Sequence, residues 1–195
     1  MTAADSPRSL ITLDELIAGY SGPVVGPVSL SVRAGEVLGL GGANGAGKST
    51  LLKALTGAAK IHSGRILRDP AVRLAHHRQR PERPPELPLL GRELLALLDA
   101  EGNPPALIRP LLDRPIAEMS GGQYQFLQAW ACLNSPVDVV LLDEPTNNLD
   151  GEAIEALGEV LGSLSPERAV VLVSHEQAFL NKHCHRRHDI EPWVS

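Results

Sequence analysis

The segment "GGANGAGKST" at residues 41–50 follows a short apolar stretch, "EVLGL" at 36–40, and precedes a segment of helical character. Residues 42–49 fit the pattern GxxxxGK[ST]. In this pattern backbone N–H groups at a helix N-terminus surround phosphate oxygens, Lys48 reaches the β and γ phosphates of a nucleotide, and Ser49 offers its hydroxyl to Mg²⁺. Because strand, loop and helix stand in the order that the motif requires, the segment predicts a nucleotide-binding site.

Two apolar segments farther along the chain end in polar side chains, "VDVVLLDEP" at 137–145 and "VLVSHEQAF" at 171–179. Asp143 is placed to hold Mg²⁺ through water, and Glu144 beside it would orient or deprotonate a water near the γ phosphate. His175 comes to the same edge of the sheet, where α/β sheets bind ligands. Alone, such residues are also typical of helix caps and solvated loops, but the phosphate loop upstream favours the catalytic interpretation.

The segment "MSGGQYQFLQAW" at 119–130 indicates a helix with two glycines in its first turn. Ser120 as N-cap and Gln123 three residues later form a capping box, which needs no further function. Gly121 and Gly122 each cost roughly 1 kcal/mol relative to alanine in a helix, so they suggest a backbone left bare for a close approach.

Strands broken by glycine are indicated in the first third of the chain and predict an antiparallel β layer. The strand-like segments lie at 9–20, 27–36, 36–42, 64–69 and 71–77. A helix from about Lys48 to Thr56 interrupts them. From Ser120 onward, helices alternate with unbroken apolar strands, which indicates a buried parallel sheet and an α/β protein.

A proline-rich stretch divides these two parts. Eight of the sixteen prolines lie between residues 81 and 115, where they frame one good helix around 91–102 and a poorer one near 106–113. This pattern predicts a small inserted helical subdomain with stiff connectors, over residues 80–135, within a single domain that covers 1–195.

The overall composition bounds the function. The chain has 195 residues, 43% of them hydrophobic, and a net charge of −5, with no Lys/Arg block longer than a pair. This balance argues against nucleic acid as a partner. Cys132 and Cys184 show no zinc or disulfide spacing and suit a reducing compartment such as the cytoplasm. No stretch approaches the roughly 18 apolar residues of a membrane span, so a membrane role would need a partner.

Taken together, the motifs resemble those of the ATP-binding cassette (ABC) ATPases, from Leu13 to about Asp189. The phosphate loop, "MSGGQ", "LLDEPTNNLD" and "VSH" occur in the family's order. The resemblance implies a P-loop NTPase core with an N-terminal antiparallel β layer and an inserted helical subdomain, and hydrolysis of ATP with Mg²⁺. It also assigns the loop 147–150 to communication between two subunits.

The resemblance further implies a role for individual residues. Tyr20 would stack on adenine, and Gln79 would touch Mg²⁺ and relay the nucleotide state to a membrane partner. The expected catalytic residues are Lys48, Glu144 and His175, and the expected Mg²⁺ ligands are Ser49, Gln79 and Asp143. The expected ATP-binding residues are Tyr20, Gly42, Asn44, Gly45, Ala46, Gly47, Lys48, Ser49, Thr50, Gln79, Ser120, Gly121, Gly122, Gln123 and Asp150.

The implied partner is a second ABC ATPase chain, identical or not, arranged head to tail. The segment that begins at Ser120 would cap the γ phosphate of ATP held by the opposite subunit, which gives the bare glycines a reason. The leading hypothesis is the ATPase subunit of an ABC transporter, peripheral on the inner face of the cell membrane through separate permease subunits. The alternative, suggested by "EPTNNLD" and "VSHEQAFL", is an ABC protein that acts on ribosomes.

Two further classes of P-loop protein fit the motifs less well. A DNA-repair ATPase of the same superfamily would need a long coiled-coil insertion, and a P-loop kinase would not account for "SGGQ" or His175. Phe126 departs from the family pattern, since arginine is usual there. The segment "HCHRRH" at 183–188 suggests a soft-metal site, but solvated histidines near the last helix and strand need no metal.

Overall fold

The computed structural model of the chain describes residues 8–79 and 89–194. It contains a three-stranded antiparallel sheet in the order β2-β1-β4 and a five-stranded parallel sheet in the order β5-β6-β7-β3-β8. The antiparallel strands are β1 (Ser9–Gly19), β2 (Pro23–Arg33) and β4 (Lys60–Arg68). The parallel strands are β3 (Val37–Gly41), β5 (Leu74–His77), β6 (Val139–Asp143), β7 (Ala169–Val173) and β8 (Arg186–Asp189).

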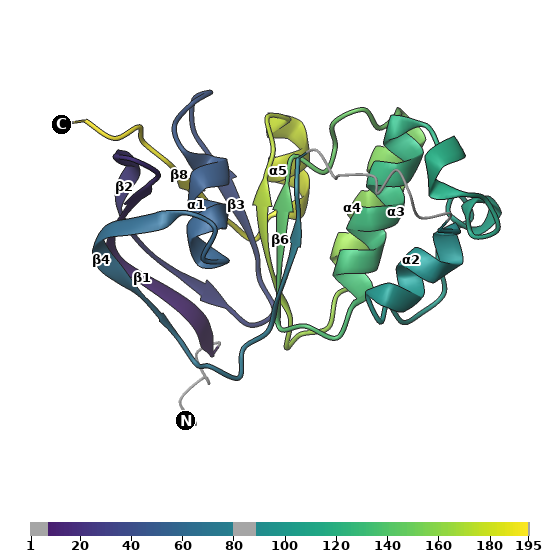
Figure 1. Ribbon diagram of the computed structural model, residues 1–195, viewed down its shortest axis with the longest axis horizontal. Coiled ribbons are helices and arrows are strands. Elements are labelled where there is room, and N and C mark those ends of the chain that lie inside the picture. Colours follow the sequence, from purple (N-terminus) through teal and green to yellow (C-terminus); the bar gives the residue numbers. More distant parts are fainter. Residues whose placement is uncertain (1–7, 80–88, 195) are drawn as a thin grey trace.

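Helices separate and cover the sheets. Helix α1 (Lys48–Leu55) contacts β1, β2, β4 and β6, so it lies between the two sheets. Figure 1 shows the remaining long helices on the far side of the parallel sheet from β1, β2 and β4. These helices are α2 (Gly91–Leu97), α3 (Gly121–Asn134) and α4 (Gly151–Gly162), followed by α5 (Gln177–His183). No helix in the described ranges is long and apolar enough to cross a membrane.

The antiparallel β layer predicted for the first third of the chain is confirmed, with one difference in its membership. The segment at 36–42, expected in the β layer, supplies β3 of the parallel sheet, and the further strand-like segment at 71–77 supplies β5 of the same sheet. The physical reason is visible in β3, where all five residues are buried. A strand buried on both faces belongs to a sheet that is covered on both sides.

Side chains alternate between two hydrophobic cores along the central parallel strands. In β6, Val139 and Leu141 face the core shared with α1 and the antiparallel sheet, whereas Val140 and Leu142 face the core under α3 and α4. All four are fully buried. The parallel sheet is therefore apolar on both faces, which explains its unbroken apolar strands.

The proline-rich stretch forms less regular helix than its sequence pattern predicts. Helix α2 ends at Leu97, short of the expected 102, and the expected helix near 106–113 reduces to a 3₁₀ turn at Arg109–Leu111. Pro110 lies within that turn and has no N–H to continue an α-helix. A second 3₁₀ turn follows at Ile116–Glu118. Residues 80–88 of the proposed 80–135 subdomain lie outside the described residues, so its bounds stay a prediction.

The strand order positions the candidate site. Strand β7 pairs with β6 on one side and β3 on the other, with Asp143 opposite Val173 and Leu40 opposite the same residue. The strands are parallel, so their C-terminal ends lie at one edge. The phosphate loop, the acidic pair and His175 follow these three strands, and the topology therefore brings them together.

Candidate active site

Most of the predicted phosphate-loop residues and the predicted catalytic residues meet in one cavity of about 340 Å³, although Gly42 and Asp143 are not in its lining. The cavity contains the phosphate loop, Gln79 two residues after β5, and the polar residues Glu144 and His175, which follow β6 and β7. Its lining consists of Val24, Asn44, Gly45, Ala46, Gly47, Lys48, Ser49, Thr50, Gln79, Glu144, Val173 and His175. Gln79 thus lies in the same cavity as the phosphate loop, and its role at Mg²⁺ stays a prediction.

The phosphate loop keeps its shape through a glycine and a buried lysine. Gly47 has a φ of 95°, and a Cβ there would lie 2.6 Å from Cβ of Val25, so no other residue fits without a shift. Helix α1 begins at the next residue, and its first-turn N–H groups have no intrahelical acceptor. The Nζ atom of Lys48 donates to the carbonyl oxygens of Gly42 (2.8 Å) and Ala43 (2.9 Å). An ammonium has three donors, so one remains for a phosphate oxygen.

Two of the three proposed Mg²⁺ ligands, Ser49 and Asp143, are in contact. The Ser49 hydroxyl donates to Oδ1 of Asp143 at 2.9 Å, and the Asp143 carboxylate is buried. Burial raises the pKa of Asp143, and the Ser49 hydrogen bond works against that rise. Hydroxyl and carboxylate oxygens are the ligands that Mg²⁺ prefers, so this pair fits the predicted ion.

The carboxylate of Glu144 is held by His175 at the end of β7. The backbone N–H of His175 donates to Oε2 at 3.1 Å, and its Nε2 lies 2.9 Å from Oε1. The Glu144 side chain is only 3% exposed, whereas that of His175 is 46% exposed. Burial raises the pKa of Glu144, and the His175 N–H lowers it in part. A raised pKa makes the carboxylate a stronger base, which suits the removal of a proton from water.

Tyr20 stands beside the cavity rather than in its lining. Its ring is half exposed, and its hydroxyl accepts a hydrogen bond of 3.2 Å from Nζ of Lys53 on α1. The same Nζ lies 5.6 Å from the ring centroid. Hydrogen bonding to the Thr50 side chain, followed by that to Lys53, lowers the pKa of Tyr20 despite its partial burial. The ring is therefore anchored to α1, the helix that follows the phosphate loop.

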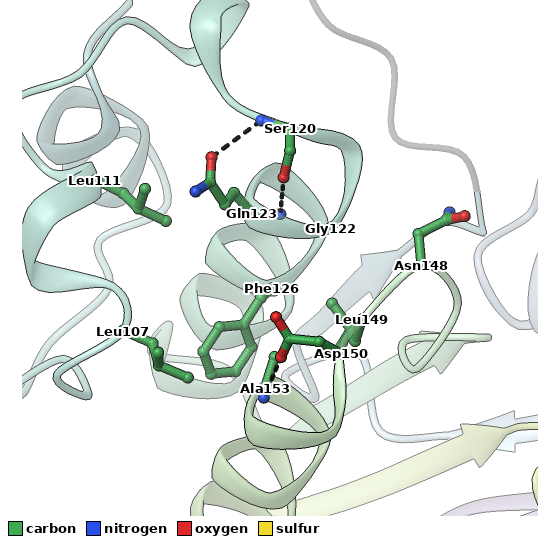
Figure 2. A pocket seen from close by; sticks show the side chains of 10 residues that line it. All are labelled: Leu107, Leu111, Ser120, Gly122, Gln123, Phe126, Asn148, Leu149, Asp150 and Ala153. Carbon is green, nitrogen blue, oxygen red and sulfur yellow. Dashed lines mark hydrogen bonds between the residues drawn. The ribbon is translucent and has the colours of Figure 1, made fainter.

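The predicted "SGGQ" residues lie at a different cavity, of about 230 Å³. The capping box is present, since Gln123 N–H donates to Oγ of Ser120 (3.2 Å) and Ser120 N–H donates to Oε1 of Gln123 (3.0 Å). Figure 2 shows this cavity, which is lined by Leu107, Leu111, Ser120, Gly122, Gln123, Phe126, Asn148, Leu149, Asp150 and Ala153. The two cavities have no lining residue in common, as expected if the two motifs act on different nucleotides.

The two adjacent glycines have different surroundings. A Cβ on Gly122 would lie 2.3 Å from the carbonyl oxygen of Asn148, in the loop that precedes α4. A Cβ on Gly121 would meet no atom within 4 Å in the described residues. Both glycines were expected to leave the backbone accessible to a partner's phosphate. Gly122, however, must lack a side chain because of this contact within its own chain. Gly121 alone is open.

Asp150 and Phe126 complete the second cavity. Oδ1 of Asp150 accepts the N–H of Ala153 at 2.9 Å and so caps α4. The buried Phe126 ring takes the place of the arginine that is usual in the family and makes this wall apolar. Figure 2 shows that ring between Leu107 and the Asp150 carboxylate.

Comparison with known proteins agrees with this geometry. A family model described as ABC transporter matches residues 25–147. The zinc import ATP-binding protein ZnuC of Yersinia pestis bv. Antiqua (strain Antiqua) is 36% identical over 178 residues, which cover 86% of this chain and 70% of ZnuC. This chain belongs to the ABC transporter ATPase family. Members of the family bind ATP.

Two solved structures show that the ABC ATPase fold extends over nearly the whole chain. The ATP binding subunit of an ABC transporter superposes with a TM-score of 0.78 at 25% identity, covering 94% of this chain and 86% of the other. The archaeal ribosome recycling factor aABCE1, in complex with the ribosomal stalk protein aP1, gives a TM-score of 0.81 at 26% identity. That match covers 97% of this chain but 38% of the recycling factor.

Sequence reasoning missed one buried polar residue of this ABC ATPase. Gln125 of α3 is 3% exposed, and its Nε2 donates to the carbonyl oxygen of Glu144 at 2.8 Å. The signal in the sequence was a glutamine between Tyr124 and Phe126, because an amide that is buried among such side chains needs a hydrogen-bond partner.

The histidine-rich segment is dispersed over α5 and β8 of the ABC ATPase. The His183 ring packs on Phe179 with centroids 4.6 Å apart, and Nδ1 of His185 accepts the N–H of Val37 at 2.9 Å. Within the described ranges no group of three or more His, Cys, Asp or Glu residues is arranged to hold a metal ion. The described side chains therefore give the soft-metal hypothesis no support.

Proposed function

We propose that this chain is the ATP-hydrolysing subunit of an ABC transporter, which drives transport through separate membrane subunits. The observation that carries the proposal is the single cavity that joins the phosphate loop, Gln79, Glu144 and His175. The relatives named as ATP-binding proteins of zinc import support a role in transport, and they make zinc the first cargo to test. Such a subunit works at the inner face of the cell membrane.

The chemistry follows from the buried carboxylate. A water attacks the γ phosphorus of ATP, the bond to the bridging oxygen breaks, ADP leaves, and the proton of the water passes to Glu144. The His175 N–H keeps the carboxylate aimed into the cavity, and Lys48 stabilises charge on the phosphate oxygens. Ser49 and Asp143, with Gln79, would hold Mg²⁺, which supplies positive charge that offsets the phosphate oxygens.

The proposed active unit is a head-to-tail pair of chains. The N-terminus of α3 and the phosphate loop line separate cavities in one chain, so a second chain would bring its own α3 over the bound nucleotide. The open position at Gly121 supports this arrangement, because a phosphate there can approach the helix N-terminus without meeting a side chain.

A substitution of the proposed base tests the catalytic assignment. In Glu144→Gln, Mg²⁺-dependent ATP hydrolysis should fall by about 10²-fold or more, because the amide cannot accept the proton, while ATP binding is retained. Glu159→Gln, an exposed position on α4, is the matched control and should hydrolyse ATP as the wild type does. The measurements are phosphate release and binding of a fluorescent ATP analogue. Wild-type rates in Glu144→Gln would remove Glu144 from the proposed role.

The similarity to aABCE1 keeps the ribosome hypothesis testable. Affinity purification of the tagged chain from its native cells should recover membrane proteins with several spans. Vesicles that contain the purified complex should then take up zinc in the presence of ATP. Recovery of ribosomal subunits, with no membrane protein, would favour action on ribosomes instead.

A further inference from the structure

We propose that Gln125 is a positioning residue for ATP hydrolysis, acting through the backbone of Glu144 and linking this base to the N-terminal end of α3. The inference rests on the proposed function, since it assigns Gln125 a part in the same reaction. It concerns the hydrogen bond of 2.8 Å between Nε2 of Gln125 and the carbonyl oxygen of Glu144.

The backbone of Glu144 needs outside support. Its φ is 52°, in the left-handed region that a residue with a side chain seldom adopts. Its N–H donates to the carbonyl of Val173 at 2.9 Å, and its carbonyl accepts the N–H of Asn147 at 3.2 Å within the following turn. Gln125 adds the shorter bond to the same carbonyl, from a different element.

The residue after Glu144 increases the importance of this bond. Pro145 has no N–H, so the peptide group between the two residues offers only its carbonyl as a hydrogen-bonding group. The orientation of that peptide group sets the direction of the Glu144 side chain toward the His175 N–H, 3.1 Å from Oε2. Without the Gln125 donor, we expect the Glu144 carboxylate to lose its fixed orientation.

The same helix contacts the loop after β6 at a second point. A Cβ on Gly122 would lie 2.3 Å from the carbonyl oxygen of Asn148, so the helix backbone approaches the loop closely here. Three residues further along α3, Gln125 donates to the carbonyl of Glu144. Both contacts are made by the first two turns of the helix that begins with Ser120. Movement of this end of α3 is therefore transmitted to the catalytic loop of the same chain.

In the proposed dimer this link has a consequence for the reaction. The α3 N-terminus of one chain meets ATP on the partner, while its Gln125 holds the base for ATP on its own phosphate loop. Docking at one nucleotide would thus set the geometry of the base at the other. Substitution of Gln125 should therefore slow the chemical step and leave ATP binding unchanged.

Gln125→Met tests the positioning role, because methionine has nearly the same length and no donor. Gln128→Met is the matched control, since Nε2 of Gln128 donates to the Tyr124 hydroxyl (2.8 Å) on the same helix and not to the catalytic loop. We expect kcat of Gln125→Met to fall about 10- to 100-fold, with KM for ATP within about twofold of wild type. Gln128→Met should keep the wild-type kcat.

Gln125→Glu provides a readout that a merely structural role would not move. A carboxylate cannot donate to the Glu144 carbonyl, but the protonated acid can, and burial raises the pKa of such a group. The kcat of Gln125→Glu relative to wild type should therefore rise as the pH falls from 8 to 6, whereas that of Gln125→Met stays flat. If Gln125→Met fails to fold, this pH profile decides the question.

The outcomes separate this inference from the proposed function. Absence of Mg²⁺-dependent hydrolysis in the wild type would overturn both. Hydrolysis in the wild type together with equal kcat in Gln125→Met and Gln128→Met would overturn only the inference, as would a pH-independent ratio for Gln125→Glu. A fall in kcat with unchanged KM, and a ratio that rises at low pH, would support it.

Discussion

Gly121 and Gly122 are neighbours on the first turn of α3, but only one of them has room for a side chain. The carbonyl of Asn148 occupies the space next to Gly122, and the space next to Gly121 is open in the described structure. Two identical residues thus serve different partners, one in the same chain and one, we propose, in the opposite chain. Substitutions at the two sites should therefore separate folding from assembly.

Alanine at each glycine gives opposite expectations for stability. Gly122→Ala would bring Cβ to 2.3 Å from a backbone oxygen, which requires the loop to shift and should lower the free energy of unfolding by about 1–3 kcal/mol. Gly121→Ala should leave that free energy within about 0.5 kcal/mol of wild type or raise it, because alanine favours helix. Urea denaturation of both variants measures the difference. Equal stabilities would contradict the assigned close contact.

The residue scale also shows where sequence reasoning ends. The phosphate-loop pattern predicts the position of Lys48 and Ser49 because both lie within ten residues of the turn that creates the site. Gln125 and the Asn148 carbonyl are brought to Glu144 and Gly122 by tertiary packing, and no local pattern encodes those pairs. The capping box at Ser120 was predictable for the opposite reason, since all its atoms lie in one turn.

At the scale of elements, the sequence predicted which segments are strands better than it predicted their partners. The segments at 36–42 and 71–77 have strand character, but their places in the parallel sheet depend on strand order, which arises from long-range contacts. Proline positions bounded the irregular stretch correctly but overstated its helices. At Pro110 the chain turns as a short 3₁₀ segment because an α-helix there would lack a donor.

The packing of β5 on α3 predicts a pH dependence of stability. His77 of β5 is 2% exposed, and burial lowers its pKa from 6.5 to about 4. The folded state therefore binds fewer protons than the unfolded state below pH 6.5, so this residue's contribution is full above that pH and is lost as the pH falls toward 4. Between pH 7.5 and 5 the loss is about 2 kcal/mol.

His77→Leu isolates this contribution from the other titrating groups. The carboxyls of Asp143 and Glu144 have raised pKa values and act in the opposite direction, but they are common to both proteins. The free energy of unfolding of wild type minus that of His77→Leu should therefore fall by about 2 kcal/mol from pH 7.5 to 5. Chemical denaturation at several pH values measures it. A difference independent of pH would mean that His77 has the same pKa in the folded and unfolded proteins.

At the scale of the whole molecule, the two cavities are the main feature. Each chain carries one phosphate cavity and one cavity at the N-terminus of α3, with no residue shared between them. In the dimer that we propose, each of these cavities would form one half of a nucleotide site, and the other half would come from the second chain.

Mixing two defective chains tests this arrangement, with Glu144→Gln in both so that ATP is not consumed. Lys48→Ala removes the phosphate-loop cation, and Gly121→Arg places a bulky side chain at a position where a Cβ meets no atom within 4 Å in the described residues. Alone, each variant lacks a complete site and should remain near 20.8 kDa in light scattering with Mg²⁺ and ATP.

When the two variants are mixed, the intact loop of the Gly121→Arg chain faces the intact α3 of the Lys48→Ala chain, so one complete site forms. Species of twice the mass, containing one chain of each kind, should then appear only with ATP. If Glu144→Gln alone dimerises with ATP but the mixture does not, the nucleotide is not shared between chains, since a site completed within one chain gains nothing from mixing.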